Sequence, residues 1–129
     1  MIKEGISEAE IVANLRGEFI EDARRRVDLL IKNRNSAETA GDPTAAYTEF
    51  KQELHTLKGM GQSFGFGSVT MIARRLETYL VGGTPQSFAG DSAVVPFLSA
   101  LDGIIDAGEE PSDDDIDEIL GGLPAPVET

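Results

Sequence analysis

The chain has 129 residues, of which 23 are acidic and 11 are basic, so its formal net charge is -12 and its isoelectric point is about 4.3. A surface of this sign argues against a nucleic-acid binder, because such proteins rely on lysine and arginine to neutralise phosphates. The length and the 40% apolar content predict one globular domain, and a chain without cysteine has no disulfide framework, thiolate metal site or thiol nucleophile.

The acidic excess lies in the C-terminal third of the chain. Residues 1–89 hold 11 basic and 12 acidic side chains, whereas residues 90–129 hold the other 11 acidic side chains and no basic one. No apolar run approaches the roughly 18 residues that span a bilayer, and the opening MIKEGISEAE lacks the apolar segment of a secretory signal. We therefore expect a cytoplasmic protein without a membrane partner.

A long first helix is predicted from Ser7 and Glu10, which have the form of a capping box, to about Asn33. Apolar residues within it recur at the three-to-four spacing of one helical face. They are Ile11, Leu15, Phe19, Ala23, Val27 and Leu30. The stretch NSAETAGDP that follows is expected to be a loop.

A second helix is predicted from Asp42 and Pro43, which have the pattern of an N-cap followed by a first-turn proline. It is expected to end at the glycines around Phe66. The inward residues of this helix are expected to be Ala46, Phe50, Leu54, Leu57 and Phe64.

Ser68 is expected to cap a third helix, which a pair of glycines at 82–83 ends. Its apolar stripe is formed by Ile72, Leu76 and Leu80. After the loop TPQSFAGD, a fourth helix is predicted from about Ser92 to Ala107, and the sequence allows a short fifth helix after Ser112. The inward residues of the fourth helix are Val94, Phe97, Leu98, Leu101, Ile104 and Ile105.

Helices of this length joined by short loops, without any strand of period-two alternation, predict an all-α, antiparallel four-helix bundle. We assign residues 1–107 to the bundle and expect residues 108–129 to form an acidic segment, part short helix and part flexible. The acidic run DDDIDE does not fit a calcium loop. Such a loop needs glycine at its sixth and glutamate at its twelfth position, which counted from Asp113 hold Glu118 and Pro124.

His55 is the only histidine, and it falls on the predicted second helix. At about 100° per residue the buried face centres on Phe50, and His55 lies about 140° away from it. The histidine is therefore expected to face outward, close to Lys51, Lys58 and Gln62.

Two glycines follow His55, although glycine in a helix interior costs about 1 kcal/mol relative to alanine. Gly61 lies on the buried face, where it allows close helix packing, but Gly59 lies on the exposed face one turn after His55. Clearance above the imidazole, with Lys51 and Lys58 one turn to either side, indicates a site for a phosphoryl group. Taken alone, both lysines are equally well explained as solvated helix charges.

The segment HTLKG followed by Gly65 resembles the signature of histidine phosphotransfer (HPt) domains, in which a histidine begins an H-x-aliphatic-K-G motif and a glycine closes the helix ten residues later. That family is a four-helix bundle with the phosphorylated histidine exposed on its second helix. The stretch KGMGQSFGF is also similar to the phosphoacceptor domain of chemotaxis-type kinases, in which a glutamate of the next helix contacts the histidine ring. Glu77 holds that position. The resemblance covers about Ile11 to Ala107, and the matching motif residues are His55, Leu57, Lys58, Gly59, Phe64 and Gly65.

The resemblance implies that Nε2 of His55 accepts a phosphoryl group from a histidine kinase or an aspartyl phosphate and passes it to a response-regulator receiver domain. We expect Lys58, supported by Lys51, to stabilise the transferred charge. Gln62 is expected to hydrogen-bond the phosphate or the ring, and Glu77 to fix the ring tautomer. The chain would be a phosphocarrier and not an enzyme by itself, with no cofactor of its own, and Mg²⁺ would be bound by the partner receiver domain.

Other interpretations remain open. Glu77 is also placed to pair with Arg74, and Phe64 and Phe66 fit core and helix-end packing. The chain is expected to stand alone, because no ATP-binding motif, receiver domain or glycine-rich phosphate loop accompanies the bundle; its starting methionine and the tail GGLPAPVET disfavour, without excluding, a phosphoacceptor domain of a larger kinase. A third interpretation is a structural adaptor bundle in which His55 is never phosphorylated.

Overall fold

The computed structural model describes residues 7–124, and every regular element in that range is helical. The predicted all-α class is confirmed, but the described residues form six α-helices, one more than four bundle helices and a short fifth one. The elements are α1 (Glu8–Thr39), α2 (Thr44–Gly61), α3 (Gly67–Leu80), α4 (Pro85–Ala89), α5 (Val95–Ala107) and α6 (Asp113–Gly121), with two 3-10 turns, η1 (Gln62–Phe64) and η2 (Ser92–Val94). Part of the expected flexible C-terminal end lies outside the described residues.

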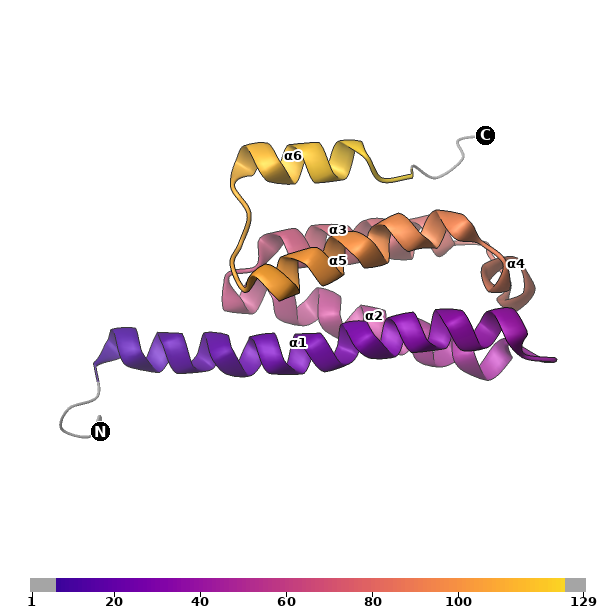
Figure 1. Ribbon diagram of the computed structural model, residues 1–129, viewed down its shortest axis with the longest axis horizontal. Helices are drawn as coiled ribbons and strands as arrows, with labels where there is room; N and C mark the ends of the chain where they lie inside the picture. Colours follow the sequence, from indigo (N-terminus) through magenta and orange to yellow (C-terminus); the bar gives the residue numbers. More distant parts are fainter. Residues whose placement is uncertain (1–6, 125–129) are drawn as a thin grey trace.

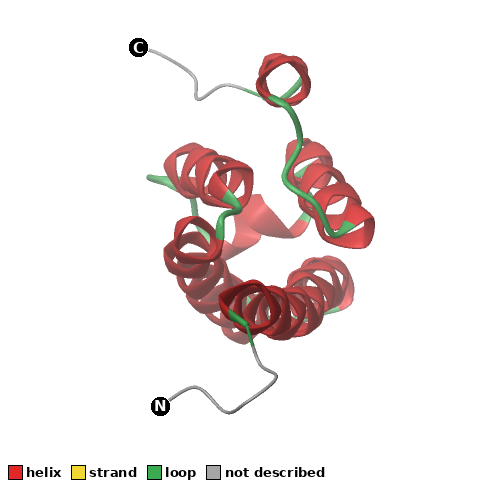
Figure 2. Cartoon of the chain, turned by 90° about the vertical axis from the view of Figure 1, so that its left-hand side faces the viewer, coloured by secondary structure: helices red, strands yellow, loops and turns green. Residues whose placement is uncertain are grey.

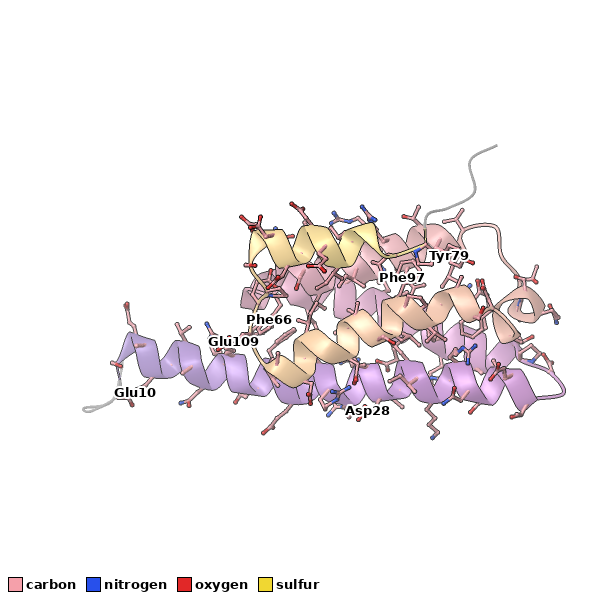
Figure 3. The ribbon with its side chains drawn as sticks, turned by 45° about the horizontal axis from the view of Figure 1, so that its top comes forward. Glu10, Asp28, Phe66, Tyr79, Phe97 and Glu109 are labelled. Carbon is pink, nitrogen blue, oxygen red and sulfur yellow. The ribbon has the colours of Figure 1, made fainter. Side chains whose placement is uncertain are left out.

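The four longest helices enclose the core. Helices α1 and α3 each contact both α2 and α5, so the four form a closed ring, which Figure 2 shows end-on. Helix α4 lies against α1 and α2 at one end (Figure 1). In Figure 3, Phe66 and Phe97 lie on the inner side of the ring and Asp28 points away from it. The largest fully buried side chains are Phe19, Phe50, Phe66, Phe88, Phe97, Leu30, Leu54, Leu57, Ile72, Leu76, Leu101 and Ile105.

Helix α1 continues past Asn33, where we expected it to end, as far as Thr39. Its buried stripe reaches Ala37, and Arg34 pairs one turn later with Glu38 at 3.3 Å. These contacts keep the segment helical although it is rich in polar residues. Of the expected loop NSAETAGDP, only the last four residues, AGDP, are non-helical.

The predicted start of α1 is confirmed, because the Ser7 hydroxyl accepts a hydrogen bond from the backbone N–H of Glu10 at 3.1 Å. The first turns of α1 extend beyond the other bundle helices (Figure 1). Leu15 is 46% exposed there, so its predicted inward position is wrong. Leu15 keeps the apolar spacing of the stripe, but the buried residues of α1 begin only at Phe19.

The starts of α2, α4 and α5 differ from the predictions in detail. Pro43, and not Asp42, is the N-cap of α2, but Asp42 Oδ1 accepts hydrogen bonds from the backbone N–H and the hydroxyl of Thr44, at 3.0 and 2.7 Å. Within the segment TPQSFAGD, which was expected to be a loop, Thr84 and Ser87 form a capping box at the start of the short helix α4. The predicted fourth helix is divided into the 3-10 turn η2 and α5.

The chain reverses direction between α2 and α3 at Gly65, whose φ of +84° lies in the left-handed region that favours glycine. The N–H of Phe66 then donates to the carbonyl of Gly61 at 2.8 Å. Phe66 is buried as expected. Phe64 is 37% exposed and stacks on Phe19 with ring centroids 5.2 Å apart, so its predicted inward position is wrong.

Ser68 does not cap α3, because the helix already begins at Gly67. Ser68 lies in the first turn and is buried, and its hydroxyl and its backbone N–H both donate to the carboxylate of Glu110, the N–H at 2.9 Å. A carboxylate at a helix N-terminus satisfies a free N–H and meets the positive end of the helix dipole. The chain beyond α5 therefore returns to α3 before α6 begins.

The short helix expected after Ser112 is present as α6, and the Ser112 hydroxyl accepts from the N–H of Asp115 at 3.2 Å. Arg75 of α3 donates to the carbonyl of Leu120 at 3.0 Å. Figures 1 and 2 show α6 outside the ring of four helices.

Candidate functional site

His55 lies on the outer face of α2. Its neighbours Leu54 and Leu57 are fully buried, whereas the His55 side chain is 72% exposed. The outward orientation predicted from the helical spacing is confirmed, because burying these two leucines turns the imidazole toward solvent.

Glu77 of α3 contacts two side chains of α2. Its Oε2 lies 3.1 Å from Nδ1 of His55, and its Oε1 lies 2.6 Å from Nζ of Lys58. An ionised carboxylate only accepts hydrogen bonds, so Nδ1 carries the ring proton in this contact. That tautomer leaves the lone pair of Nε2 free, and no hydrogen bond to Nε2 is present within residues 7–124. The pairing of Glu77 with Arg74, which the sequence left open, is not the one observed.

The Glu77 carboxylate is kept ionised by its two partners. Burial by itself raises the pKa of this carboxyl group, but hydrogen bonds from Lys58 and His55, the charge of Lys58 and, when the ring is protonated, the charge of His55 together lower it by more. The pKa of Glu77 therefore lies below its ordinary value. The carboxylate is an acceptor for Nδ1 over the whole neutral pH range.

The space above the imidazole is open at Gly59. A Cβ atom placed on Gly59 meets nothing within 4 Å outside its own helix, as the sequence led us to expect. At Gly61, by contrast, a Cβ atom would lie 2.7 Å from Oγ1 of Thr70 and 2.8 Å from the carbonyl oxygen of Phe66. The two glycines thus differ in role: Gly61 allows α3 to approach, and Gly59 leaves room beside His55.

A family model of the Hpt domain matches residues 14–110. The chain belongs to the Hpt domain family. Hpt domains act in histidine phosphotransfer within phosphorelays, together with receiver domains and histidine kinases. Comparison with curated proteins and with solved structures gave no match.

Two predicted site residues of this Hpt domain, Lys51 and Gln62, take no part in the hydrogen bonds that link His55, Glu77 and Lys58. Nζ of Lys51 lies 4.5 Å above the ring centroid of Tyr47, in a cation–π contact. Lys51 and Glu77 nevertheless line the same hollow of about 380 Å³ between α2 and α3. Gln62 belongs to the 3-10 turn after α2, and its hydrogen bond is made by its backbone N–H.

Sequence reasoning missed Thr70 of α3. Its hydroxyl accepts from the backbone N–H of Gln62 and donates to the carbonyl of Lys58, both at 2.8 Å, and the residue is 5% exposed. A threonine among apolar residues on a helix has no distinctive pattern. The nearest signal was Gly61, whose missing side chain indicated a close approach by another helix.

Further properties of the Hpt domain concern metals and membranes. Within residues 7–124 there is no group of three or more histidine, cysteine, aspartate or glutamate side chains that is arranged to bind a metal ion. No helix in the same range has both the length and the apolar character needed to cross a bilayer. A larger hollow of about 880 Å³, between α5 and α6, contains none of the predicted site residues.

Proposed function

We propose that this Hpt domain is a phosphocarrier that accepts a phosphoryl group on Nε2 of His55 and exchanges it with receiver-domain aspartates. One observation carries the proposal: the exposed imidazole is held through Nδ1 by Glu77, which directs its free Nε2 lone pair to solvent. A histidine of this kind is a nucleophile near neutral pH.

In the transfer step the Nε2 lone pair of His55 forms an N–P bond with the phosphorus of an aspartyl phosphate. The P–O bond to the aspartate breaks, and its electron pair restores the aspartate carboxylate. The ring keeps its Nδ1 proton and so gains positive charge, which the carboxylate of Glu77 offsets at 3.1 Å. The reverse step returns the phosphoryl group to an aspartate, so no other co-reactant is consumed.

The surrounding residues would contribute positioning and charge, which are the main requirements of phosphoryl transfer. Lys58, one turn after His55, can supply its ammonium group to the phosphoryl oxygens. Lys51, one turn before His55, would support it at longer range, and Gln62 would hydrogen-bond an oxygen at the other end of the open surface. Gly59 leaves the space that the phosphoryl group and the partner need.

The step is shared with a partner, so the domain would have no catalytic activity of its own. We assign the Mg²⁺ that assists the transfer to the acidic pocket of the receiver domain. A histidine kinase would supply the phosphoryl group to the relay, either directly or through a first receiver.

The experiment is phosphoryl transfer from a receiver domain labelled with radioactive phosphate. The wild-type chain is expected to gain label that is labile to acid and stable to base, as a phosphohistidine is, and the His55→Gln variant is expected to gain none. Circular dichroism of both proteins checks that the fold is retained. Equal labelling of wild type and variant would show that His55 is not the acceptor, and a wild type that takes no label from any receiver would favour the structural adaptor.

A further inference from the structure

Thr70 lies where α3 meets the last turn of α2. Its hydroxyl contacts two backbone groups four residues apart, accepting from the N–H of Gln62 and donating to the carbonyl of Lys58. These two groups are the partners that an α-helix normally joins to each other at its end. The hydroxyl of α3 is thus built into the backbone hydrogen bonding of α2.

Thr70 lies on the face of α3 that also carries Glu77. Thr70 and Glu77 are seven residues apart, which places both on the same face of α3, about two turns from each other. Thr70 reaches the backbone of Lys58, and Glu77 reaches the ammonium group of Lys58 and the ring of His55. Lys58 is therefore contacted by α3 at both ends, at its carbonyl oxygen and at its Nζ.

Close approach of the helices makes the contact possible. Gly61 has no side chain, and an added Cβ atom there would come within 2.7 Å of Oγ1 and 3.0 Å of the backbone nitrogen of Thr70. Thr70 is 5% exposed, so water does not readily replace its hydroxyl. If the hydroxyl is lost, the carbonyl of Lys58 in α2 and the N–H of Gln62 in η1 lose a partner next to the candidate site.

We infer that Thr70 is a positioning residue for phosphoryl transfer: its hydroxyl fixes the register of α2 against α3, so that Glu77 meets His55 and Lys58 together. This inference rests on the proposed function for its effect on transfer. Its effect on the histidine ring is independent of that function, because the contact between His55 and Glu77 exists before any phosphoryl group arrives.

The test compares Thr70→Val, which has the same shape without the hydroxyl, with Thr70→Ser, which keeps the hydroxyl. Thr78→Val is the matched control, because Thr78 lies on the same helix, is exposed, and its hydroxyl donates to the carbonyl of Arg74 within its own helix. Two quantities are measured: the rate of transfer from a labelled receiver domain, and the tautomer of His55 from the ¹⁵N shifts of its ring nitrogens in the chain alone.

In Thr70→Val the transfer rate is expected to fall roughly five- to tenfold, because small displacements of reacting groups are costly, and the population with the proton on Nδ1 is expected to fall. Thr70→Ser and Thr78→Val should match the wild type in both. A Thr70→Val protein with wild-type rate and wild-type tautomer overturns the inference. If Thr70→Val does not fold, Thr70→Ala, which has the higher helix propensity, takes its place.

The two proposals fail in different ways. A wild-type chain that takes no label contradicts the phosphocarrier function and leaves the tautomer measurement to decide the role of Thr70. A labelled wild type together with an unchanged tautomer and rate in Thr70→Val keeps the function and removes the positioning role.

Discussion

Glu77 and His55 are 22 residues apart in sequence, and Oε2 of the glutamate lies 3.1 Å from Nδ1 of the histidine. The glutamate also binds Lys58 at 2.6 Å, so one carboxylate orients the imidazole and holds the ammonium group of Lys58. The histidine itself is exposed, but the contact that selects its tautomer is partly sheltered, since the Glu77 side chain is 28% exposed. The reactivity we propose for Nε2 therefore depends on a residue of the neighbouring helix.

Replacing the Glu77 carboxylate by an amide tests this dependence. In Glu77→Gln the side chain can both donate and accept, so it no longer selects the tautomer with Nδ1 protonated, and it no longer offsets the charge of the phosphorylated ring. We expect transfer to fall about tenfold, the lower end of the cost of removing a group that orients an imidazole ligand. Glu49→Gln, an exposed change on α2, removes the same charge and is expected to transfer at the wild-type rate. Equal rates for the two variants would contradict the role of Glu77.

The same carboxylate predicts a pH dependence of stability. The pKa of Glu77 is lower in the folded chain than its ordinary value of 4.5, so the unfolded chain binds more protons between the two values. The stabilising contribution of Glu77 is therefore complete above the ordinary value and is lost as the pH falls through the folded value. In urea unfolding, the free-energy difference between wild type and Glu77→Gln should shrink as the pH falls from about 5 to about 3. A difference that is constant or grows over this range would contradict the lowered pKa.

The sequence predicted the parts of the site that depend on one helix. The outward direction of His55 follows from the spacing of buried residues along α2, and the open space at Gly59 follows from a glycine on an exposed face. The contact between His55 and Glu77 was predicted only through the resemblance to a family, because the spacing of residues within one helix does not show which residues of another helix lie beside them. Thr70 was missed for the same reason, since its role exists only where two helices meet.

The fold was predicted well in its interior and less well at its ends. Apolar spacing identified every buried residue of α5 and the three predicted ones of α3, but in α2 it missed buried Tyr47. It also failed at Leu15, which is exposed on α1, and at Phe64, which stacks on Phe19. Helix ends depend on polar contacts from distant residues, such as that of Glu110 with Ser68, and these leave no local pattern. The end of α1 was misplaced because polar composition indicated a loop where buried Ala37 continues the helix.

Replacing Gly59 by a larger residue is expected to raise the stability of the chain and to block phosphoryl transfer. Glutamine at this exposed helical position should stabilise the chain by about 1 kcal/mol, because glycine is a poor helix former, and should block transfer by filling the space beside His55. Gly103→Gln on α5 is the matched control, since Gly103 is also helical with nothing within 4 Å of an added Cβ. It should gain similar stability and keep the wild-type transfer rate. Thermal unfolding and the label assay measure both; a Gly59→Gln protein with full transfer contradicts the need for clearance.

The two lysines near His55 are expected to differ. Lys58→Met removes the ammonium group that Glu77 holds beside the ring, and transfer should fall about tenfold, as the loss of one charge-assisted hydrogen bond predicts. Lys51 lies over the ring of Tyr47, and methionine there keeps the apolar packing. Because exposed charges at longer range are screened by salt, Lys51→Met should lower transfer by less than about threefold. The reverse order of the two effects, at fixed ionic strength, would contradict the assignment of the main role to Lys58.

Glu110 connects the chain after α5 to the start of α3, beyond the residue 107 at which we first placed the end of the bundle. Glu110→Ala removes the acceptor of the Ser68 N–H and hydroxyl, and we expect a loss of about 1–2 kcal/mol in the free energy of unfolding. Glu109→Ala, a change of equal charge at an exposed neighbour, should stay within about 0.5 kcal/mol of the wild type.

Two truncated chains distinguish the contribution of the contact between Glu110 and Ser68 from that of the rest of the acidic segment. A chain that ends after Pro111 keeps Glu110 and loses α6, so it should be more stable than a chain that ends after Gly108. If the two truncated chains unfold at the same urea concentration, the contact between Glu110 and Ser68 contributes nothing to the stability of the fold. If the longer chain is more stable by the same amount that Glu110→Ala loses, the contact of Glu110 with Ser68 accounts for the difference, and the bundle extends beyond residue 107 to Glu110.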